Sequence, residues 1–278
     1  MDDRRNGLQK ILPPVSIFMT FECDEKVRRL PVTSDSDQHI VIHPRRNKKE
    51  QLLPENGLLL VNPSEASECL GRMKQSGGAS RFLFNSGLVV ANDPPYFAAG
   101  PAIGAPMAVL TLEKLIALGA KKVILFGWCG AIAPNLQVGD IIVPARALSG
   151  EGTSRYYITD ATPGPDLHLS SQIVKILSDN SIAVHRDCVW STDAVYREDR
   201  RMLHGLRRDQ GVGAVDMEFS ALCTVAAFRG IEFTAILTVS DELWGDSWRP
   251  GFSKKLFMEQ KQAALKLLLA HLGHIGDK

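Results

Sequence analysis

The pattern of apolar residues constrains the fold of this chain more than any other feature. From about residue 40 onward, short apolar runs typical of buried strands alternate with longer segments whose apolar residues recur at helical spacing. The predicted strands cover residues 58–62, 81–84, 88–91, 122–126, 140–143, 183–189, 214–216 and 233–239, and the predicted helices cover 105–118, 166–177, 217–229 and 253–272. This alternation predicts an α/β fold, namely a three-layer α/β/α sandwich around a mixed, largely parallel sheet. In such sheets ligands bind beyond the carboxyl ends of the strands, so residues that follow strands are the first candidates for a site.

Length and composition fit one domain of this kind. The chain has 278 residues, of which 45% are hydrophobic and 23% are charged, as in ordinary globular proteins. Residues 1–38 are rich in charge, Pro and Ser, and we expect them to form an N-terminal extension to a domain at 39–278. The chain has 32 Lys and Arg and 31 Asp and Glu, so its net charge is close to zero. No overall basic field attracts nucleic acid or a membrane, and a small-molecule ligand is favoured.

The cysteines and the apolar runs exclude several other classes of protein. The five cysteines are scattered and form no Cys-x-x-Cys pair, which disfavours a disulfide framework and a zinc site. We expect buried free thiols, no metal and no cofactor. The sequence contains no signal peptide and no apolar run of the roughly 20 residues that span a membrane, so a cytoplasmic protein is expected.

Two glycine-containing segments lie where a ligand would bind. Residues 100–107 (GPAIGAPM) lead into a predicted helix, and residues 121–131 (KKVILFGWCGA) form a predicted strand that ends in a glycine turn. Glycines before a helix either let backbone N–H groups approach a ligand oxygen or only allow the turn. Trp128 either stacks on a base or fills the core. Neither segment has the Gly-x-Gly-x-x-Gly spacing, so a dinucleotide site is disfavoured.

Two acidic side chains interrupt apolar surroundings at the ends of predicted strands. Glu218 lies at a strand-to-helix junction, where it is either a partner for the helix dipole or an acceptor for sugar hydroxyls. Asp241 follows the long apolar strand 233–239, where it either caps a helix or acts as a general acid.

Taken together and in order, these segments resemble the nucleoside phosphorylase superfamily, which includes purine nucleoside phosphorylases, uridine phosphorylases and related nucleosidases. The resemblance covers roughly residues 40–272, and its most specific pieces are VGDIIVP at 138–144 and DME at 216–218. The other matching runs lie at 100–106, 127–130, 151–157, 192–198 and 239–241.

The resemblance implies an enzyme, a pentosyltransferase of nucleoside metabolism and salvage that cleaves an N-glycosidic bond. In this family the base departs from an oxocarbenium-like ribose while phosphate or water attacks the anomeric carbon. By position, Glu218 would hold the ribose hydroxyls and Met217 would pack on the sugar. Asp241 matches the acid that protonates or hydrogen-bonds the leaving purine, so it and Glu218 are the predicted catalytic residues.

The resemblance also implies the residues around the base, although it leaves the choice between purine and uracil open. The predicted substrate-binding side chains beyond Met217 are Trp128, Cys129, Gly130, Val195, Tyr196, Arg201 and His43. Arg201 matches one of the two residues that read uracil in uridine phosphorylases, whereas Asp199 replaces the amide of the other. Val195 stands where many members have a Phe against the base.

The sequence departs from the family at phosphate. The usual Gly-Asp-Pro-x-Arg loop reads Val-Asn-Pro-Ser-Glu at residues 61–65, so that an acid, Glu65, replaces the arginine. Leu125 and Trp128 stand where the family has a second phosphate-binding Arg and a Ser or Thr, and neither can replace a bidentate guanidinium. Arg81 is the one predicted phosphate-binding residue that remains.

The family builds its site across a dimer, which implies a homodimer or a trimer of dimers here. By position, His43 would reach the ribose 5′-hydroxyl of a neighbouring subunit, and Arg81 would contact phosphate across the same interface. His43 is equally compatible with an ordinary surface histidine.

Three functions stay open. The first is cleavage by phosphate held in a non-standard way, the second is hydrolysis as in the nucleosidases, and the third is a nucleoside-binding protein whose catalytic site has degraded. Retention of both Glu218 and Asp241 favours an enzyme, because binding alone needs no general acid.

Overall fold

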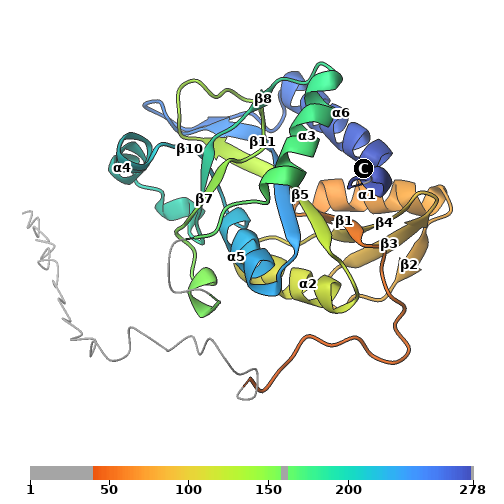
Figure 1. Cartoon of the computed structure of the whole chain (residues 1–278). Coiled ribbons are helices and arrows are strands. Elements are labelled where there is room, and N and C mark those ends of the chain that lie inside the picture. The colour runs from red at the N-terminus through yellow and green to blue at the C-terminus, as the bar shows by residue number, and fades with distance from the viewer. Residues whose placement is uncertain (1–39, 158–161, 277–278) are drawn as a thin grey trace, which may run out of the picture. The chain divides into compact units, whose positions relative to one another are not determined.

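A computed structural model of the chain describes residues 40–157 and 162–276, so the predicted extension at 1–38 lies outside the described residues (Figure 1). The strands are β1 (Asn56–Leu60), β2 (Ala79–Arg81), β3 (Gly87–Asn92), β4 (Pro95–Gly100), β5 (Lys122–Ala131), β6 (Ile141–Ile142), β7 (Arg146–Ser149), β8 (Val184–His185), β9 (Cys188–Ser191), β10 (Val212–Asp216), β11 (Glu232–Glu242) and β12 (Arg249–Pro250). The helices are α1 (Pro63–Gln75), α2 (Ala105–Ala117), α3 (Leu167–Asp179), α4 (Arg200–Gln210), α5 (Phe219–Arg229) and α6 (Lys255–His271), with 3₁₀ turns η3 (Ser154–Tyr156), η4 (Val195–Arg197) and η5 (Leu272–His274).

The strands form one mixed sheet with β5 at its centre. Strand β5 pairs in parallel with β1 and with β11, and the last residues of β5 pair antiparallel with β10. Beyond these, β4, β3 and β2 extend one side, and β9 and β7 extend the sheet past β10. The sheet is therefore mixed and largely parallel, as predicted.

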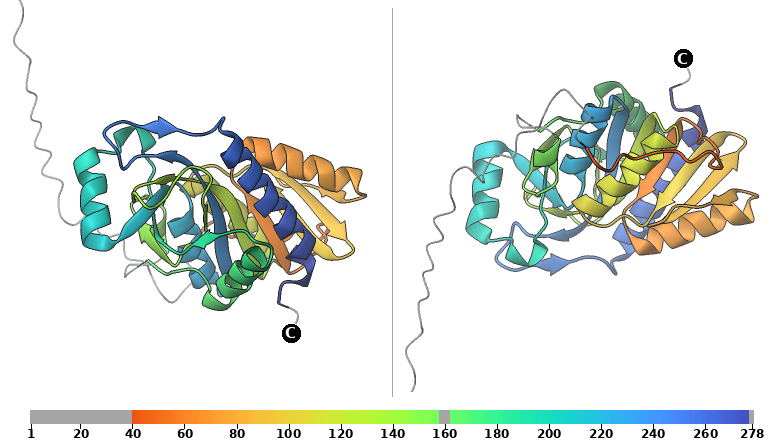
Figure 2. Two further views of the ribbon diagram at one scale, coloured as in Figure 1. Left: turned by 90° about the horizontal axis from the view of Figure 1, so that it is seen from above. Right: turned by 90° about the horizontal axis from the view of Figure 1, so that it is seen from below.

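Helices cover both faces of the sheet. Helices α2 and α5 pack on one face, and α1, α3 and α6 pack on the other (Figures 1 and 2). Successive residues of β5 alternate between these layers: Val123 and Leu125 belong to the core under α2 and α5, and Ile124 and Phe126 belong to the core under α6. The predicted three-layer α/β/α sandwich is confirmed.

Several predicted elements differ in extent. The strand predicted at 81–84 lies instead at Ala79–Arg81, where it pairs with β3, while Phe82 and Phe84 are exposed. The strand predicted at 183–189 is two strands, β8 and β9. Helices α1 and α4 and strand β4 were not predicted. Both segments are rich in polar residues, so their apolar stripes are narrow: Ala66, Cys69, Leu70 and Met73 in α1, and Leu203 as the single buried residue of α4.

The central strand is longer than predicted, and this corrects the expected glycine turn. Residues 127–130 lie within β5 because β11 pairs with β5 along its whole length, from Glu232 beside Lys122 to Glu242 beside Ala131. Gly130 is needed for close packing, since a Cβ there would lie 2.3 Å from Leu243 Cδ1.

Among residues 40–157 and 162–276, no helix has the length and apolar character needed to cross a membrane. The same residues contain no group of three or more His, Cys, Asp and Glu side chains arranged to hold a metal ion.

Candidate active site

A cavity of about 460 Å³ opens beside the ends of β1, β5, β10 and β11. The pairing of Gly130 with Asp241 brings the ends of β5 and β11 to the same edge of the sheet. The cavity is lined by Val61, Asn62, Ile103, Trp128, Cys129, Gly130, Val195, Tyr196, Glu198, Val215, Asp216, Met217, Glu218, Ser240, Asp241, Leu243, Trp248 and Phe252. Most of the predicted site residues therefore meet in one pocket, although they come from four separate segments.

Glu218 lies at the pocket between the end of β10 and the start of α5. The Asp216 Oδ2 atom accepts hydrogen bonds from the backbone N–H of Glu218 at 3.2 Å and of Phe219 at 2.7 Å. Helix α5 therefore begins at Phe219, and Asp216 is the carboxyl that faces its N-terminus. The Glu218 Oε1 atom accepts a hydrogen bond from Gly104 N at 2.5 Å. Glu218 does not occupy the first turn of the helix, and its carboxyl lines the cavity.

Asp216 and Glu218 both have raised pKa values. Asp216 and Glu218 are 5% and 4% exposed, and burial is the largest cause that raises the pKa of both groups. The charge of Asp216 raises the pKa of Glu218 further, whereas hydrogen bonds from Ser191, Phe219 and Glu218 lower that of Asp216. The pair therefore holds a proton at a pH where isolated carboxyls are ionised.

We expect Glu218→Gln to stabilise the protein increasingly as the pH rises. Below the ordinary carboxyl pKa, Glu218 is protonated in both states and contributes no difference. Above the ordinary carboxyl pKa, Glu218 is ionised in the unfolded chain but still protonated in the folded protein. The free energy of unfolding of the wild type therefore falls until the pH passes the raised pKa of the folded state. Thermal unfolding at pH 5 and pH 8 should show the advantage of Glu218→Gln widening by about 1–2 kcal/mol. An advantage that stays constant between these pH values would contradict the shift.

A hydrogen-bonded network fixes Asp216 from behind. The Ser191 hydroxyl donates to Asp216 Oδ1 at 2.5 Å and accepts from Ser220 N at 2.9 Å, and the Ser220 hydroxyl donates to Glu151 Oε1 at 3.0 Å. Burial alone would raise the pKa of Glu151, but hydrogen bonds from the Ser154 and Ser149 side chains and from the backbone lower it. Glu151 is thus a fully bonded, ionised anchor for β9 and α5, a role that the sequence did not reveal.

Asp241 lies inside β11 at a register shift. The strand pairing slips between Val239 and Asp241, so that Asp241 faces the cavity although β11 continues to Glu242. Both of its carboxyl oxygens accept hydrogen bonds, Oδ1 from the Ser240 hydroxyl at 2.6 Å and Oδ2 from Trp248 Nε1 at 2.8 Å. Asp241 caps no helix.

Trp128 packs in the core and also borders the cavity, whereas stacking on a base stays a prediction. It lines the cavity, and its ring also packs edge-on against Phe257 with centroids 5.3 Å apart and tilted against Phe252 at 5.8 Å. The neighbouring Cys129 lines the cavity as a neutral thiol, because burial and the Asp216 charge raise its pKa well above the ordinary value. Cys129 is therefore a poor nucleophile.

Val195 and Tyr196 reach the cavity from η4, whereas Arg201 does not. Tyr196 is fully exposed at the rim, and Val195 is 45% exposed. The Arg201 side chain is 95% exposed on α4, with its Nε 3.9 Å from Asp199 Oδ1. Asp199 in turn caps α4 by accepting from the backbone N–H of Arg201 and Met202. The cap explains the acid at position 199 without any contact to a base.

His43 and Arg81 lie outside this cavity. His43 lines a separate hollow of about 920 Å³ beside α2, together with the exposed side chains of Ile42 and Phe84. Arg81 donates a hydrogen bond to the Leu52 carbonyl at 3.0 Å. Within one chain, neither residue contributes to the cavity that holds Glu218 and Asp241.

The cavity residues that were not predicted as site residues include Glu198, Trp248 and Phe252. Glu198 follows η4, and Trp248 and Phe252 lie between β11 and α6. Burial, together with the charge of Asp241, raises the pKa of Glu198 to about 7. Glu198 was part of the matching segment 192–198 in the sequence, but no local pattern indicated that its carboxylate faces Asp241.

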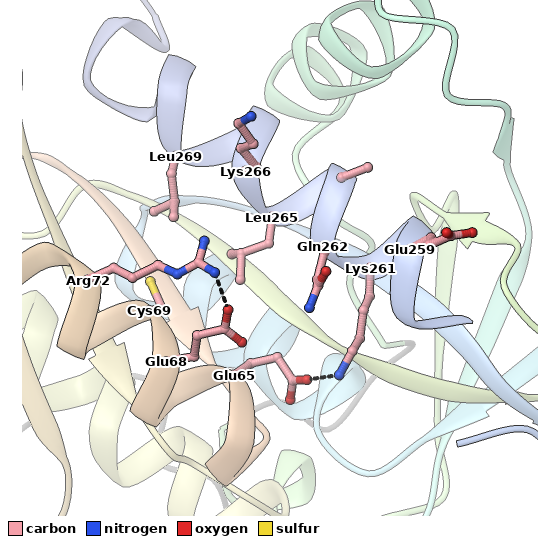
Figure 3. A pocket seen from close by; sticks show the side chains of 11 residues that line it. Glu65, Glu68, Cys69, Arg72, Glu259, Lys261, Gln262, Leu265, Lys266 and Leu269 are labelled. Atoms are coloured by element: carbon pink, nitrogen blue, oxygen red, sulfur yellow. Dashed lines mark hydrogen bonds and ion pairs between the residues drawn. The ribbon is translucent and has the colours of Figure 1, made fainter. Parts of the chain in front are cut away.

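Behind Trp128, a buried ion pair occupies the space between α1 and α6. Lys261 Nζ donates to Glu65 Oε1, and the two side chains are 8% and 6% exposed (Figure 3). The same ammonium lies 5.1 Å from the centroid of the Trp128 ring. Glu65, which stands where the family has an arginine, is therefore paired with a lysine 196 residues away.

Comparisons with known proteins agree with this architecture. A guanosine phosphorylase of Halorubrum lacusprofundi is 31% identical over 142 residues, which are 51% of this chain and 58% of that protein. The chain thus spans less than two thirds of the length of this relative. Two solved structures share the fold. The purine nucleoside phosphorylase of Toxoplasma gondii in complex with immucillin-H has a TM-score of 0.70 and 20% identity, and the match covers 84% of this chain and 95% of that one. The AMP nucleosidase of Bacteroides thetaiotaomicron has a TM-score of 0.60 and 22% identity, and the match covers 78% of this chain and 90% of that one.

The family assignment rests on the sequence model that covers most of the domain. Residues 65–272 match the model described as the phosphorylase superfamily, and this span contains Glu218, Asp241 and the whole of β5 and β11. The chain therefore belongs to the phosphorylase superfamily.

Proposed function

We propose that this protein is an enzyme that cleaves the N-glycosidic bond of a nucleoside, with a preference for purine nucleosides. The observation that carries the proposal is the meeting of Glu218 and Asp241, from different elements, in one cavity lined otherwise by apolar and aromatic side chains. A cavity of about 460 Å³ suits a ligand of nucleoside size. The guanosine phosphorylase among the relatives supports a purine base.

The roles follow from the chemistry of the lining. Glu218 has one oxygen bonded to Gly104 N, which leaves the other to accept hydrogen bonds from ribose hydroxyls. Met217 provides an apolar contact for the sugar, and Trp128 and Val195 provide flat or apolar surface for the base. Cys129 and Gly130 form the floor, and Asp241 contacts the leaving base. Positive charge that develops at the anomeric carbon favours the ionised form of the Glu218 carboxyl, so this contact helps most in the transition state.

The charges of the cavity favour water over phosphate as the attacking group. Among the described residues that line it, four are carboxylic acids, Glu198, Asp216, Glu218 and Asp241, and none is Lys, Arg or His. The N-terminus of α1 at Asn62 offers about half of a positive charge, which is small against several carboxyls in a partly buried space. Lys261 is bound to Glu65 on the far side of Trp128.

Two atoms of the cavity also suit water. The Asn62 Oδ1 atom is buried and accepts no hydrogen bond from the described residues. A free amide oxygen can bind a hydrogen of water, and Trp128 Nε1, which also lacks a partner among the described residues, can donate to a water oxygen. Arg81 of a second copy is the one predicted cation that could oppose this preference.

We expect the purified protein to release free base from purine nucleosides at the same rate with and without phosphate. Hydrolysis adds a hydroxyl from water to the anomeric carbon and leaves ribose, whereas phosphorolysis leaves ribose 1-phosphate. Chromatography of base and sugar products from a panel of purine and pyrimidine nucleosides measures both. Release of base that requires phosphate would favour a phosphorylase and would indicate that Arg81 binds the phosphate. Arg81→Ala tests that role. No release from any nucleoside would favour the nucleoside-binding alternative.

The exposed apolar residues around His43 support the predicted homo-oligomer. Ile42, Phe84 and Leu110 line the same hollow as His43 and are 84%, 58% and 47% exposed. A contiguous apolar surface of this kind is typical of a subunit interface. We propose that a second copy covers it. Neither nucleic acid nor a membrane is proposed as a partner, and the expected cytoplasmic location stays a prediction.

A further inference from the structure

Glu198 and Asp241 form a second pair of carboxyls in the cavity, and nothing in the sequence assigned a role to Glu198. The two residues come from different parts of the chain, Glu198 from the turn between η4 and α4, and Asp241 from β11. Both line the cavity, together with Tyr196 and Trp248. The pair is distinct from Asp216 and Glu218, which lie at the junction of β10 and α5.

The surroundings of the two carboxyls differ in a way that separates their roles. Both oxygens of Asp241 already accept hydrogen bonds, from the Ser240 hydroxyl and from Trp248 Nε1. These two donors occupy lone pairs on both oxygens, so Asp241 has fewer sites free for a ligand. The Glu198 carboxyl makes no side-chain hydrogen bond with residues 40–157 and 162–276, so both of its oxygens are available to a ligand.

The charges around Glu198 favour retention of its proton. It is partly buried, and burial first and the charge of Asp241 second raise its pKa to about 7. The other acids of the cavity are Asp216 and Glu218. Two arginines outside the lining form ion pairs of their own, Arg200 with Asp246 at 3.8 Å and Arg249 with Glu242 at 3.7 Å. Two carboxyls whose environments separate their protonation states are the usual basis of an acid and charge pair.

We propose that Glu198 is the general acid that protonates the departing base, and that Asp241 is the fixed charge that keeps the proton on Glu198. This inference rests on the proposed cleavage of a nucleoside. As the bond between the anomeric carbon and the base nitrogen breaks, its electron pair moves to the base and the Glu198 proton passes to a base nitrogen. Water adds to the anomeric carbon and loses a proton, which restores Glu198. Asp241 thus acts through Glu198 as well as through its contact with the base.

The test compares two leaving groups in Glu198→Gln. A nucleoside base leaves slowly without a proton, whereas the phenolate of 4-nitrophenyl β-D-riboside needs none. We expect kcat/KM for the nucleoside to fall by about 10²–10⁴-fold, with kcat/KM for the nitrophenyl riboside changed by only a few fold. Glu242→Gln is the matched control, because Glu242 is a buried carboxyl beside Asp241 that does not line the cavity, with Oε1 accepting from Val138 N.

The pH profile gives a second, independent readout. Because an acid must be protonated to act, wild-type turnover of the nucleoside should be full below pH 7 and fall as the pH rises through about 7. Glu198→Gln should lack this falling limb. Asp241→Asn should move it to lower pH, because removal of the negative charge lowers the pKa of Glu198.

Each other outcome overturns a definite part of the argument. Glu198→Gln with unchanged nucleoside activity, or with equal loss on both substrates, would show that Glu198 is not the acid. A falling limb that persists in Glu198→Gln would assign it to another group. A wild type that cleaves the nitrophenyl riboside but no nucleoside, or cleaves neither, would overturn the proposed function and this inference with it.

Discussion

Replacement of Glu218 by alanine should lower the rate of base release by about 10²–10³-fold, the largest effect on activity expected for a single substitution outside the acid pair. The Glu218 carboxyl is 4% exposed, is held by Gly104 N at 2.5 Å and faces the cavity between β1, β5 and β10. Its contacts with ribose hydroxyls strengthen as positive charge develops on the sugar, so their loss affects kcat more than KM.

Glu218→Gln removes the charge of the side chain but keeps its shape, so it distinguishes the two contributions to activity. The amide oxygen still accepts from Gly104 N, so this variant should fold with the wild-type secondary structure, measured by circular dichroism, yet turn over slowly. Glu242→Gln again provides a control that should keep wild-type activity. If the protein is a binding protein, titration calorimetry with a nucleoside should instead show weaker affinity in Glu218→Ala and no turnover in any variant.

Replacement of Lys261 by methionine should lower the free energy of unfolding by about 3–5 kcal/mol, the largest expected effect on stability. Lys261 and Glu65 are 8% and 6% exposed between α6 and α1 (Figure 3). Methionine preserves the volume but leaves the Glu65 carboxylate buried with a single remaining side-chain donor, the Ser64 hydroxyl at 2.9 Å. The ammonium also lies between the Trp128 and Phe257 rings, 5.1 and 5.2 Å from their centroids, and this contact is lost as well.

Chemical denaturation of three variants distinguishes an unpaired charge from a simple loss of packing. The double variant Lys261→Met with Glu65→Leu removes both charges and should recover most of the lost stability. Glu68→Gln breaks the neighbouring Arg72–Glu68 pair, whose side chains are 68% and 44% exposed, and should cost less than about 1 kcal/mol. A loss in Lys261→Met no larger than that in Glu68→Gln would show that the buried pair contributes little.

The sequence and the structure agree best where the signal is local. The strand at 88–91 and the helices at 105–118 and 253–272 were predicted close to their observed bounds, because burial of a strand or of one helix face imposes a period on nearby residues. Glu218 and Asp241 were also identified from local context, as acids that interrupt apolar segments near strand ends. Both do line the cavity.

The predictions from the sequence were wrong where the structure of one segment depends on contacts with another segment. Residues 127–130 read as a turn because of their glycines, yet they are strand because β11 pairs with them along its full length. Asp199 was compared with a base-reading residue, but in the structure it caps α4. In both cases the deciding contact lies outside the window that a local pattern covers.

By itself, the sequence determined the α/β architecture, the family and the two acids on which the proposed chemistry depends, because apolar periodicity and strand-end acids are recorded within a few residues. Only the tertiary structure decided which distant groups share an environment. It paired Glu65 with Lys261, set Glu198 beside Asp241, and left His43 and Arg81 outside the cavity. The physical reason is that desolvation and the interaction of charges depend on distance in space, which folding sets and sequence separation does not.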